Sequence, residues 1–397
     1  MVREIAIQGY LFVFRCFFSL FSICPQKKKT TFVASFGDNV LFTMKALEEQ
    51  TDDQVVVLKT ASCRVNFRDA KDRMVLTFEL RHVLDWIRSI YHLATSRHIF
   101  IDNYFGFLAA VRFKPNVKCI QLWHAAGAIK QFGLKDPSNQ YRSPQANERF
   151  RRVYSQFDHV VVGGEKMAEI FRESFGITDS QILRTGIPRT DFFYNEEAMR
   201  NAANALQSKY PIIQRKKVIL YAPTYRENEF NVSSLPLDID EMYQALQDEY
   251  VLLLRLHPAV HFDFSNTYPD FVFDVSQHAD VNELLVVTDL LISDYSSIPF
   301  EFSLLERPMV FFAYDLQDYA RSRGFWEPYE QLVPGPIVQT TEELIQTIQR
   351  AEFDFHQIVN FSMDWNAYST GNASDRLIQA MYREQKSSAI PERGQNS

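Results

Sequence analysis

The sequence predicts two α/β domains with Rossmann-like parallel sheets that face a common cleft. Its 397 residues are too many for one ordinary hydrophobic core, and two domains are the usual solution at this length. Short apolar segments alternate with helical patterns from residue 30 onward, which is typical of strands in a parallel sheet. A polar, helical stretch over residues 192–215 interrupts this alternation, which then begins again. We therefore expect one domain on each side of that stretch.

We predict that residues 1–29 form a separate, membrane-associating segment. Residues 5–24 are rich in Phe, Leu and Ile, and three lysines follow at 27–29. On a helix the polar side chains of this segment fall within an arc of about 60°; they are Glu4, Gln8, Arg15, Ser19 and Ser22. A membrane-spanning helix would place Arg15 near the bilayer centre at a cost of about 2.5–3.5 kcal/mol. An amphipathic helix lying in the interface, with the lysines on anionic headgroups, avoids that cost.

The apolar side of this helix is the expected membrane contact. We predict that Phe14, Phe17 and Phe21 face the lipid. Basic residues at 112, 114 and 118 could supplement the attraction to anionic lipids, although the preferred interpretation of these residues is a solvated loop. Packing of the helix on its own domain or on a partner subunit is the alternative.

Residues 30–191 contain the first domain. Apolar segments at 30–37, 54–59, 97–105, 117–123 and 158–164 predict strands. Apolar residues at helical spacing follow the last of these, and Gly176 ends that helix.

Residues 192–215 form the predicted linker, and residues 216–386 form the second domain. Strands are expected at 217–223, 250–258, 271–276, 289–294 and 309–314, with helices near 239–248, over 280–287 and from about 298. The tail at 387–397 is expected to be disordered.

The overall composition excludes several classes of protein. A net charge of −7 and a pI near 5.8 argue against nucleic acid as the main partner, because such proteins usually carry a basic excess. The four cysteines show neither CxxC spacing nor a nearby histidine cluster, so we expect a reducing cytosol and no zinc or disulfide framework. No histidines have the spacing of a metal pair on one helix. We expect no bound metal and no cofactor.

Polar side chains that follow buried strands are the candidate functional residues, because parallel α/β sheets bind ligands at the carboxyl ends of their strands. His124 follows such a strand, and the small residues after it leave space beside the imidazole. His257 lies near the end of another strand, and Pro258 stops the hydrogen bonding of that strand directly after it. We predict acid-base catalysis by both histidines. A structural, hydrogen-bonded imidazole is the alternative for each.

A phosphate site is predicted where the strand at 289–294 leads into a helix. Hydroxyls and backbone N–H groups at a helix start can hold an anion without a glycine-rich loop. The predicted substrate-binding residues here are Ser293, Asp294, Ser296, Ser297 and Glu301, the last of which could instead compensate the helix dipole. Other strand ends add cationic and hydroxyl donors suited to phosphate oxygens; these are Lys130, Arg189, Thr224, Arg226 and Arg255.

Five segments of the chain carry a family resemblance. They are, in order, WHAAGAIKQFG, TGIPRTD, LYAPTYR, LRLHP and ISDYSSIPFEFSLLERP. In this order and at these intervals they resemble the CDP-glycerol glycerophosphotransferase family of wall teichoic acid synthesis, most closely its glycerol-phosphate primases. The resemblance implies a GT-B fold and a peripheral enzyme on the cytoplasmic face of the cell membrane.

The same resemblance implies a reaction and its partners. Glycerol phosphate would pass from CDP-glycerol, held by the C-terminal domain, to the N-acetylmannosaminyl-N-acetylglucosamine of an undecaprenyl-diphosphate-linked disaccharide on the N-terminal domain, with CMP leaving. By family analogy His124 would be the base, Glu301 would lie near donor hydroxyls, and the diphosphate would be held by His257, Arg189, Thr224, Ser296 and Ser297. Other enzymes of teichoic acid synthesis are further candidate partners.

Two departures from the family pattern favour a primase over a polymerase. Ala125 and Ala126 stand where many longer relatives have Gly-Thr, and the large additional N-terminal portion of many polymerases is absent from this sequence. A short poly(glycerol phosphate) polymerase, a ribitol phosphate transferase, a GT-B nucleotide-sugar glycosyltransferase and an inactive assembly factor remain alternatives.

Overall fold

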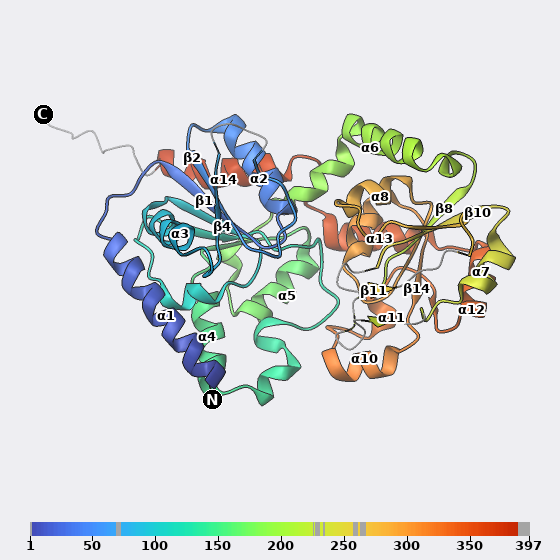
Figure 1. Ribbon diagram of the computed structural model, residues 1–397, viewed down its shortest axis with the longest axis horizontal. Coiled ribbons are helices and arrows are strands. Elements are labelled where there is room, and N and C mark those ends of the chain that lie inside the picture. The colour runs from blue at the N-terminus through green and yellow to red at the C-terminus, as the bar shows by residue number, and fades with distance from the viewer. Residues whose placement is uncertain are drawn as a thin grey trace, which may run out of the picture.

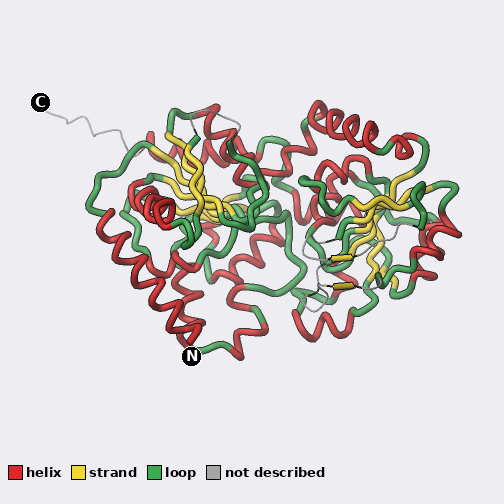
Figure 2. Tube along the Cα trace, viewed as in Figure 1, coloured by secondary structure: helices red, strands yellow, loops and turns green. Residues whose placement is uncertain are grey.

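The computed structural model describes residues 2–68, 73–224, 226, 231–232, 235–256, 261–262 and 267–387. These residues form two α/β domains that lie side by side (Figure 1). Each domain has a central sheet with helices packed around it (Figure 2). The predicted fold class is confirmed.

The N-terminal domain is built on a seven-stranded parallel sheet with the order β3-β2-β1-β4-β5-β6-β7. Its strands are β1 (Lys29–Ala34), β2 (Gln54–Lys59), β3 (Met74–Thr77), β4 (His98–Ile101), β5 (Lys118–Gln121), β6 (His159–Val161) and β7 (Ile182–Leu183). The five predicted strands are present. The edge strands β3 and β7 were not predicted, because β3 is only partly buried and β7 has two residues.

Helices cover both faces of this sheet. They are α1 (Val2–Phe21), α2 (Asp38–Gln50), α3 (Val83–Thr95), α4 (Pro144–Tyr154) and α5 (Glu165–Phe175), with 3-10 turns η1 (Gly106–Ala110), η2 (Gly133–Lys135), η3 (Pro137–Tyr141), η4 (Asp179–Gln181) and η5 (Pro188–Tyr194). Gly176 ends α5 as predicted, in the left-handed conformation that glycine adopts without strain (φ 67°).

The C-terminal domain has a six-stranded parallel sheet with the order β12-β10-β8-β13-β14-β15. Its strands are β8 (Lys217–Tyr221), β10 (Tyr250–Leu254), β12 (Val272–Asp274), β13 (Leu290–Ser293), β14 (Met309–Phe312) and β15 (Ile337–Val338), and β9 (Asn231–Val232) pairs with β11 (His261–Phe262) in a separate sheet. Its helices are α7 (Ile239–Leu246), α8 (Val281–Val287), α9 (Ile298–Phe302), α10 (Leu316–Arg323), α11 (Tyr329–Leu332), α12 (Thr341–Arg350) and α13 (Phe355–Asn366), with η7 (Ser303–Leu305).

The chain crosses between the domains twice. The stretch predicted as a linker contains α6 (Glu196–Lys209) and η6 (Pro211–Gln214), and α6 packs on α8. The last helix, α14 (Ala373–Ser387), lies within the predicted second domain but packs on α2 of the first (Figure 1). Its Tyr382 hydroxyl lies 2.6 Å from Thr30 Oγ1 and donates to Asp53 Oδ2 at 2.8 Å. Residues 388–397, expected to be disordered, lie outside the described residues.

Helix α1 packs one face on its own domain and exposes another. Phe14 is fully buried, stacks on Phe107 at 5.1 Å and meets Trp86 edge-on at 5.7 Å. Phe17 and Phe21 are half-buried against rings of α3. The prediction that these three phenylalanines face lipid is therefore wrong, because they pack against the domain itself.

The exposed face of α1 carries a different apolar set. Its members are Ile5, Phe12, Val13 and Leu20, with exposures of 66%, 67%, 44% and 58%. By length and composition alone, the helix from Arg3 to Phe21 could also cross a membrane. Large exposed apolar side chains in a row mark a surface that meets lipid or another protein.

Candidate active site

A cavity of about 510 Å³ lies where the loop after β5 meets the start of α9 and helix α10. This volume is ordinary for a small-molecule site. Three predicted site residues line the cavity, namely His124, Lys130 and Ser297. Residues of both domains contribute to it, as expected for a site in an interdomain cleft.

The loop conformation and two aromatic rings fix the imidazole of His124. Trp123 has a positive φ of 60°, which turns the chain sharply after β5, and its carbonyl oxygen accepts a hydrogen bond from Asn39 Nδ2 at 2.9 Å. The imidazole stacks on Phe36 at 4.1 Å and on the Trp123 ring at 4.3 Å. His124 is therefore held in one orientation at the cavity wall.

The hydrogen bonding of His124 determines its tautomer. Its Nδ1 lies 3.2 Å from the carbonyl oxygen of Asp102. Because a carbonyl oxygen only accepts, Nδ1 carries the hydrogen and Nε2 keeps its lone pair. Burial lowers the pKa of His124 to about 4, and the charges of Arg189 and Lys130 act in the same direction. The imidazole is thus neutral at pH 7 and able to accept a proton.

Cations dominate the cavity wall around His124. Lys130 lies with its Nζ 5.9 Å from the centre of the Tyr319 ring, and burial lowers its pKa. Arg142 and Arg323 also line the cavity, whereas Asp136 is its one acidic lining residue among those described. The net positive lining suits a ligand that carries phosphate groups.

Glu301 and Arg189 lie together across the domain boundary. Both are buried, with exposures of 1% and 8%. Glu301 Oε1 accepts hydrogen bonds from Arg189 Nε and from the backbone N–H of Ala126, each at 2.9 Å, and Arg189 Nη2 also donates to it. Glu301 Oε2 has no hydrogen-bond partner among the described residues. The pair fixes the loop that carries His124.

Arg226 and Asp294 form a second buried network. The guanidinium donates to Asp294 Oδ2 at 2.7 Å and forms a two-point contact with Asp315 at 3.0 and 3.1 Å. Burial opposes its charge, but the two carboxylates outweigh burial and raise the pKa of Arg226. Asp294 Oδ1 accepts from the backbone N–H of Thr224 at 2.7 Å. Arg226 and Asp294, both predicted to bind substrate, thus bind each other, because each neutralises the other's buried charge.

The remaining predicted residues take varied positions. Ser293 Oγ donates to the Ala222 carbonyl at 3.0 Å, and Ser296 Oγ accepts from the backbone N–H of Ile298 at 3.3 Å. Thr224 Oγ1 is buried without a hydrogen-bond partner among the described residues. Arg255 donates to the His278 carbonyl at 2.8 Å, and burial lowers its pKa. His257 lies outside the residues that the structure describes, so its catalytic role stays a prediction.

Several polar residues of the site were not singled out from the sequence. Asp38 Oδ2 lies 3.8 Å from Arg189 Nη1, and Asn39 Oδ1 accepts from the backbone N–H of Arg189 at 3.0 Å. The carboxylate of Asp102 accepts from the backbone N–H groups of residues 35–37, and burial raises its pKa to about 6. These residues follow β1 and β4, so the strand-end criterion that selected His124 could also have found them. In the described part of the chain, no group of three or more His, Cys, Asp or Glu side chains is arranged to hold a metal ion.

Sequence comparison assigns the family. Residues 16–383 match the model of the CDP-Glycerol:Poly(glycerophosphate) glycerophosphotransferase family. The chain belongs to this family. This glycerophosphotransferase is 35% identical over 379 residues to a teichoic acid glycerol-phosphate primase of Bacillus subtilis (strain 168), with 95% of this chain and 97% of that protein covered. It is 38% identical over 354 residues to the primase of Bacillus spizizenii, with 88% and 91% covered.

Solved structures confirm the fold of the glycerophosphotransferase. The wall teichoic acid polymerase TagF superimposes with a TM-score of 0.78 and 22% identity, covering 98% of this chain and 100% of that chain. The fold is therefore GT-B-like, as predicted.

Proposed function

We propose that this glycerophosphotransferase is a primase that transfers glycerol phosphate from CDP-glycerol to an N-acetylmannosaminyl-N-acetylglucosamine disaccharide on undecaprenyl diphosphate, with CMP leaving. The near full-length similarity to glycerol-phosphate primases carries this proposal, with 97% and 91% of those two proteins covered. By contrast, the chain covers 49%, 59% and 54% of three ribitol-phosphate polymerases. A ribitol-phosphate primase is 36% identical, which keeps CDP-ribitol as the competing donor.

The cavity chemistry supports an in-line phosphoryl transfer. Nε2 of neutral His124 takes the proton of an acceptor hydroxyl while that oxygen attacks the phosphorus that bears glycerol. The bond between this phosphorus and the CMP oxygen breaks, and CMP leaves with the electron pair. Lys130 and the arginines at the wall offset the charge on the phosphate oxygens. Glu301 Oε2 accepts a hydrogen bond from a donor hydroxyl.

A donor comparison tests the proposed function. The full-length protein is given the lipid-linked disaccharide with CDP-glycerol, CDP-ribitol or a nucleotide sugar, and release of the nucleotide is followed. We expect CMP release with CDP-glycerol at a kcat/KM at least about a hundredfold above that with CDP-ribitol, because a site fitted to glycerol leaves the additional hydroxyls of ribitol without hydrogen-bond partners. Preferred turnover of CDP-ribitol or of a nucleotide sugar would overturn the donor assignment.

The pH dependence of turnover tests the state of His124. A base whose pKa is lowered to about 4 is already unprotonated at neutral pH, so it loses activity only when pH falls through that value. We therefore expect kcat/KM to decline toward low pH with a midpoint near 4, well below the ordinary histidine value of about 6.5. The pH profile of initial rates measures this midpoint. A midpoint near 6.5 that disappears in His124→Ala would contradict the neutral, buried imidazole.

We also propose that the exposed face of α1 is the membrane contact and that the enzyme is peripheral, on the cytoplasmic face of the cell membrane. Val13→Ser with Leu20→Ser removes two of its exposed apolar side chains. We expect this double variant to shift from sedimenting with vesicles to the soluble fraction, with unchanged turnover of a detergent-solubilised acceptor. Phe355→Ser with Met363→Ser, exposed on α13, is the matched control and should stay bound. Equal sedimentation of both double variants would rule out this face.

A further inference from the structure

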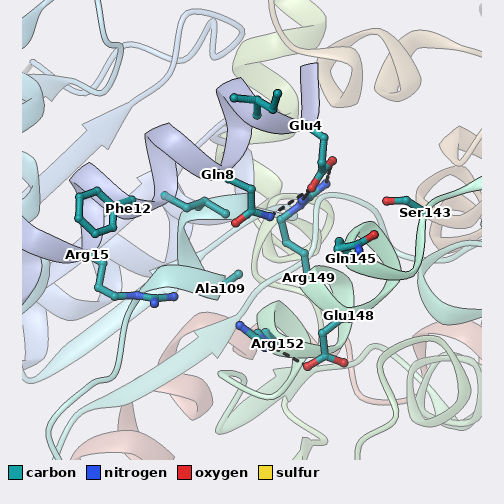
Figure 3. A pocket seen from close by; sticks show the side chains of 12 residues that line it. Glu4, Gln8, Phe12, Arg15, Ala109, Ser143, Gln145, Glu148, Arg149 and Arg152 are labelled. Carbon is teal, nitrogen blue, oxygen red and sulfur yellow. Dashed lines mark hydrogen bonds and ion pairs between the residues drawn. The ribbon is translucent and has the colours of Figure 1, made fainter. Parts of the chain in front are cut away.

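A second cavity, of about 900 Å³, lies between α1 and α4 (Figure 3). Its walls differ in character. Ile5, Leu11 and Phe12 of α1 supply apolar surface, and three arginines at positions 15, 149 and 152 supply positive charge. Figure 3 shows Arg15 reaching from α1, with Arg149 and Arg152 coming from α4. A ligand suited to this cavity has an anionic group next to an aliphatic chain.

The arginines of the α1–α4 cavity are only partly neutralised. Arg149 Nη1 binds Glu4 Oε1 at 2.6 Å, and Arg152 Nε binds Glu148 Oε1 at 3.0 Å. Arg15 forms no ion pair or hydrogen bond with another described residue. Three guanidinium groups thus face two carboxylates, so the cavity keeps an excess of positive charge. Guanidinium groups bind phosphate oxygens through paired hydrogen bonds, so the excess favours a phosphate-bearing ligand.

One chain segment forms walls of both cavities. Asp136, Ser138 and Arg142 line the active-site cavity. The next residue in the chain, Ser143, lines the α1–α4 cavity. Ser143 is also the N-cap of α4, and its Oγ accepts from the backbone N–H of Ala146 at 3.1 Å. A ligand in the α1–α4 cavity therefore lies next to the candidate active site. The exposed apolar face of α1, including Phe12, borders the same cavity.

We propose that the α1–α4 cavity binds the diphosphate and the adjoining isoprenoid of the lipid-linked acceptor. The arginines of the cavity bind the diphosphate, and the apolar side chains of α1 pack on the isoprenoid. The disaccharide extends along residues 136–143 toward His124. This inference rests on the proposed function for the identity of the acceptor. An ordinary phospholipid also carries a phosphate, but it has no disaccharide that could extend along residues 136–143 to His124.

Binding of undecaprenyl diphosphate in detergent micelles tests the proposal without any turnover. The test variant is Arg15→Ala with Arg152→Ala, because both side chains are exposed and line the cavity. The control is Arg151→Ala with Arg200→Ala, which changes the charge equally at two exposed side chains outside the cavity. We expect the test variant to bind at least about tenfold more weakly and the control to bind like wild type. Equal affinity of the two variants would overturn the site. Wild-type binding of phosphatidylglycerol micelles as tight as that of undecaprenyl diphosphate would also overturn it, because the site would then be a general headgroup site.

Turnover separates this inference from the proposed function. With the lipid-linked disaccharide and CDP-glycerol, the test variant should show a KM for the acceptor raised by a similar factor, with the KM for CDP-glycerol and kcat unchanged. If the test variant is active and its KM for the acceptor is unchanged, the α1–α4 cavity is not the acceptor site, and the primase function stands. No turnover by the wild type, with undecaprenyl diphosphate binding still dependent on Arg15 and Arg152, would overturn the function and leave the lipid site intact.

Discussion

Replacing His124 by Ala should lower kcat by about a thousandfold, because a positioned general base contributes roughly 10²–10⁴ to such reactions. The affinity for CDP-glycerol should change little, since the base acts on the acceptor hydroxyl. Steady-state CMP release measures the first effect, and equilibrium binding of CDP-glycerol measures the second. The expectation follows from the neutral imidazole at the cavity wall, with its Nδ1 hydrogen on the carbonyl of Asp102.

His356→Ala on the exposed surface of α13 is the control for this experiment. It should retain wild-type kcat and the wild-type melting temperature. His124→Ala removes a ring that stacks between Phe36 and Trp123, so its melting temperature must be measured alongside. Unfolding of His124→Ala would show that the imidazole is structural, and CMP release at the wild-type rate would rule it out as the base.

Replacing Arg189 by Met should destabilise the protein by about 3–5 kcal/mol, because it leaves the carboxylate of Glu301 buried without its counter-charge. The two side chains are 8% and 1% exposed, so water cannot replace the lost partner. The free energy of unfolding in urea measures the loss. Arg189→Met combined with Glu301→Leu should recover much of it, because the buried charge is then gone as well.

Arg184→Met is the matched control for the buried pair. Arg184 also pairs with carboxylates, those of Glu165 and Asp179, but its side chain is 33% exposed and theirs are 51% and 59% exposed. Solvent screening limits such surface pairs to about 1 kcal/mol. If Arg189→Met lowers the free energy of unfolding no more than Arg184→Met does, the pair of Arg189 and Glu301 stabilises the protein no more than a surface ion pair.

The sequence was sufficient to predict both sheets because most of their strands are short, buried and largely apolar, and helical patterns separate them. Edge strands such as β7, with two residues, carry too little pattern to be recognised. The sequence led to the wrong lipid-facing side of α1 for a different reason. Its helix is apolar over most of its circumference, so the pattern alone does not distinguish the face that packs around Phe14 from the exposed face around Phe12.

The candidate site was only partly predictable, because several of its polar residues come together only when the chain folds. The strand-end criterion found His124 and Lys130, which line one cavity. It could not show that Arg189 binds Glu301, because these residues are 112 positions apart and meet only through the packing of the two domains. The same holds for Arg226 and Asp294, 68 positions apart. Polar residues chosen one by one as ligand contacts can instead satisfy each other.

The most direct test of the proposed primase function is mass analysis of the lipid product after reaction with CDP-glycerol and an undecaprenyl-diphosphate-linked disaccharide. The full-length protein should release one CMP per acceptor and add a single glycerol phosphate to the disaccharide. A ladder of products with several glycerol phosphates would contradict the primase function and indicate a polymerase.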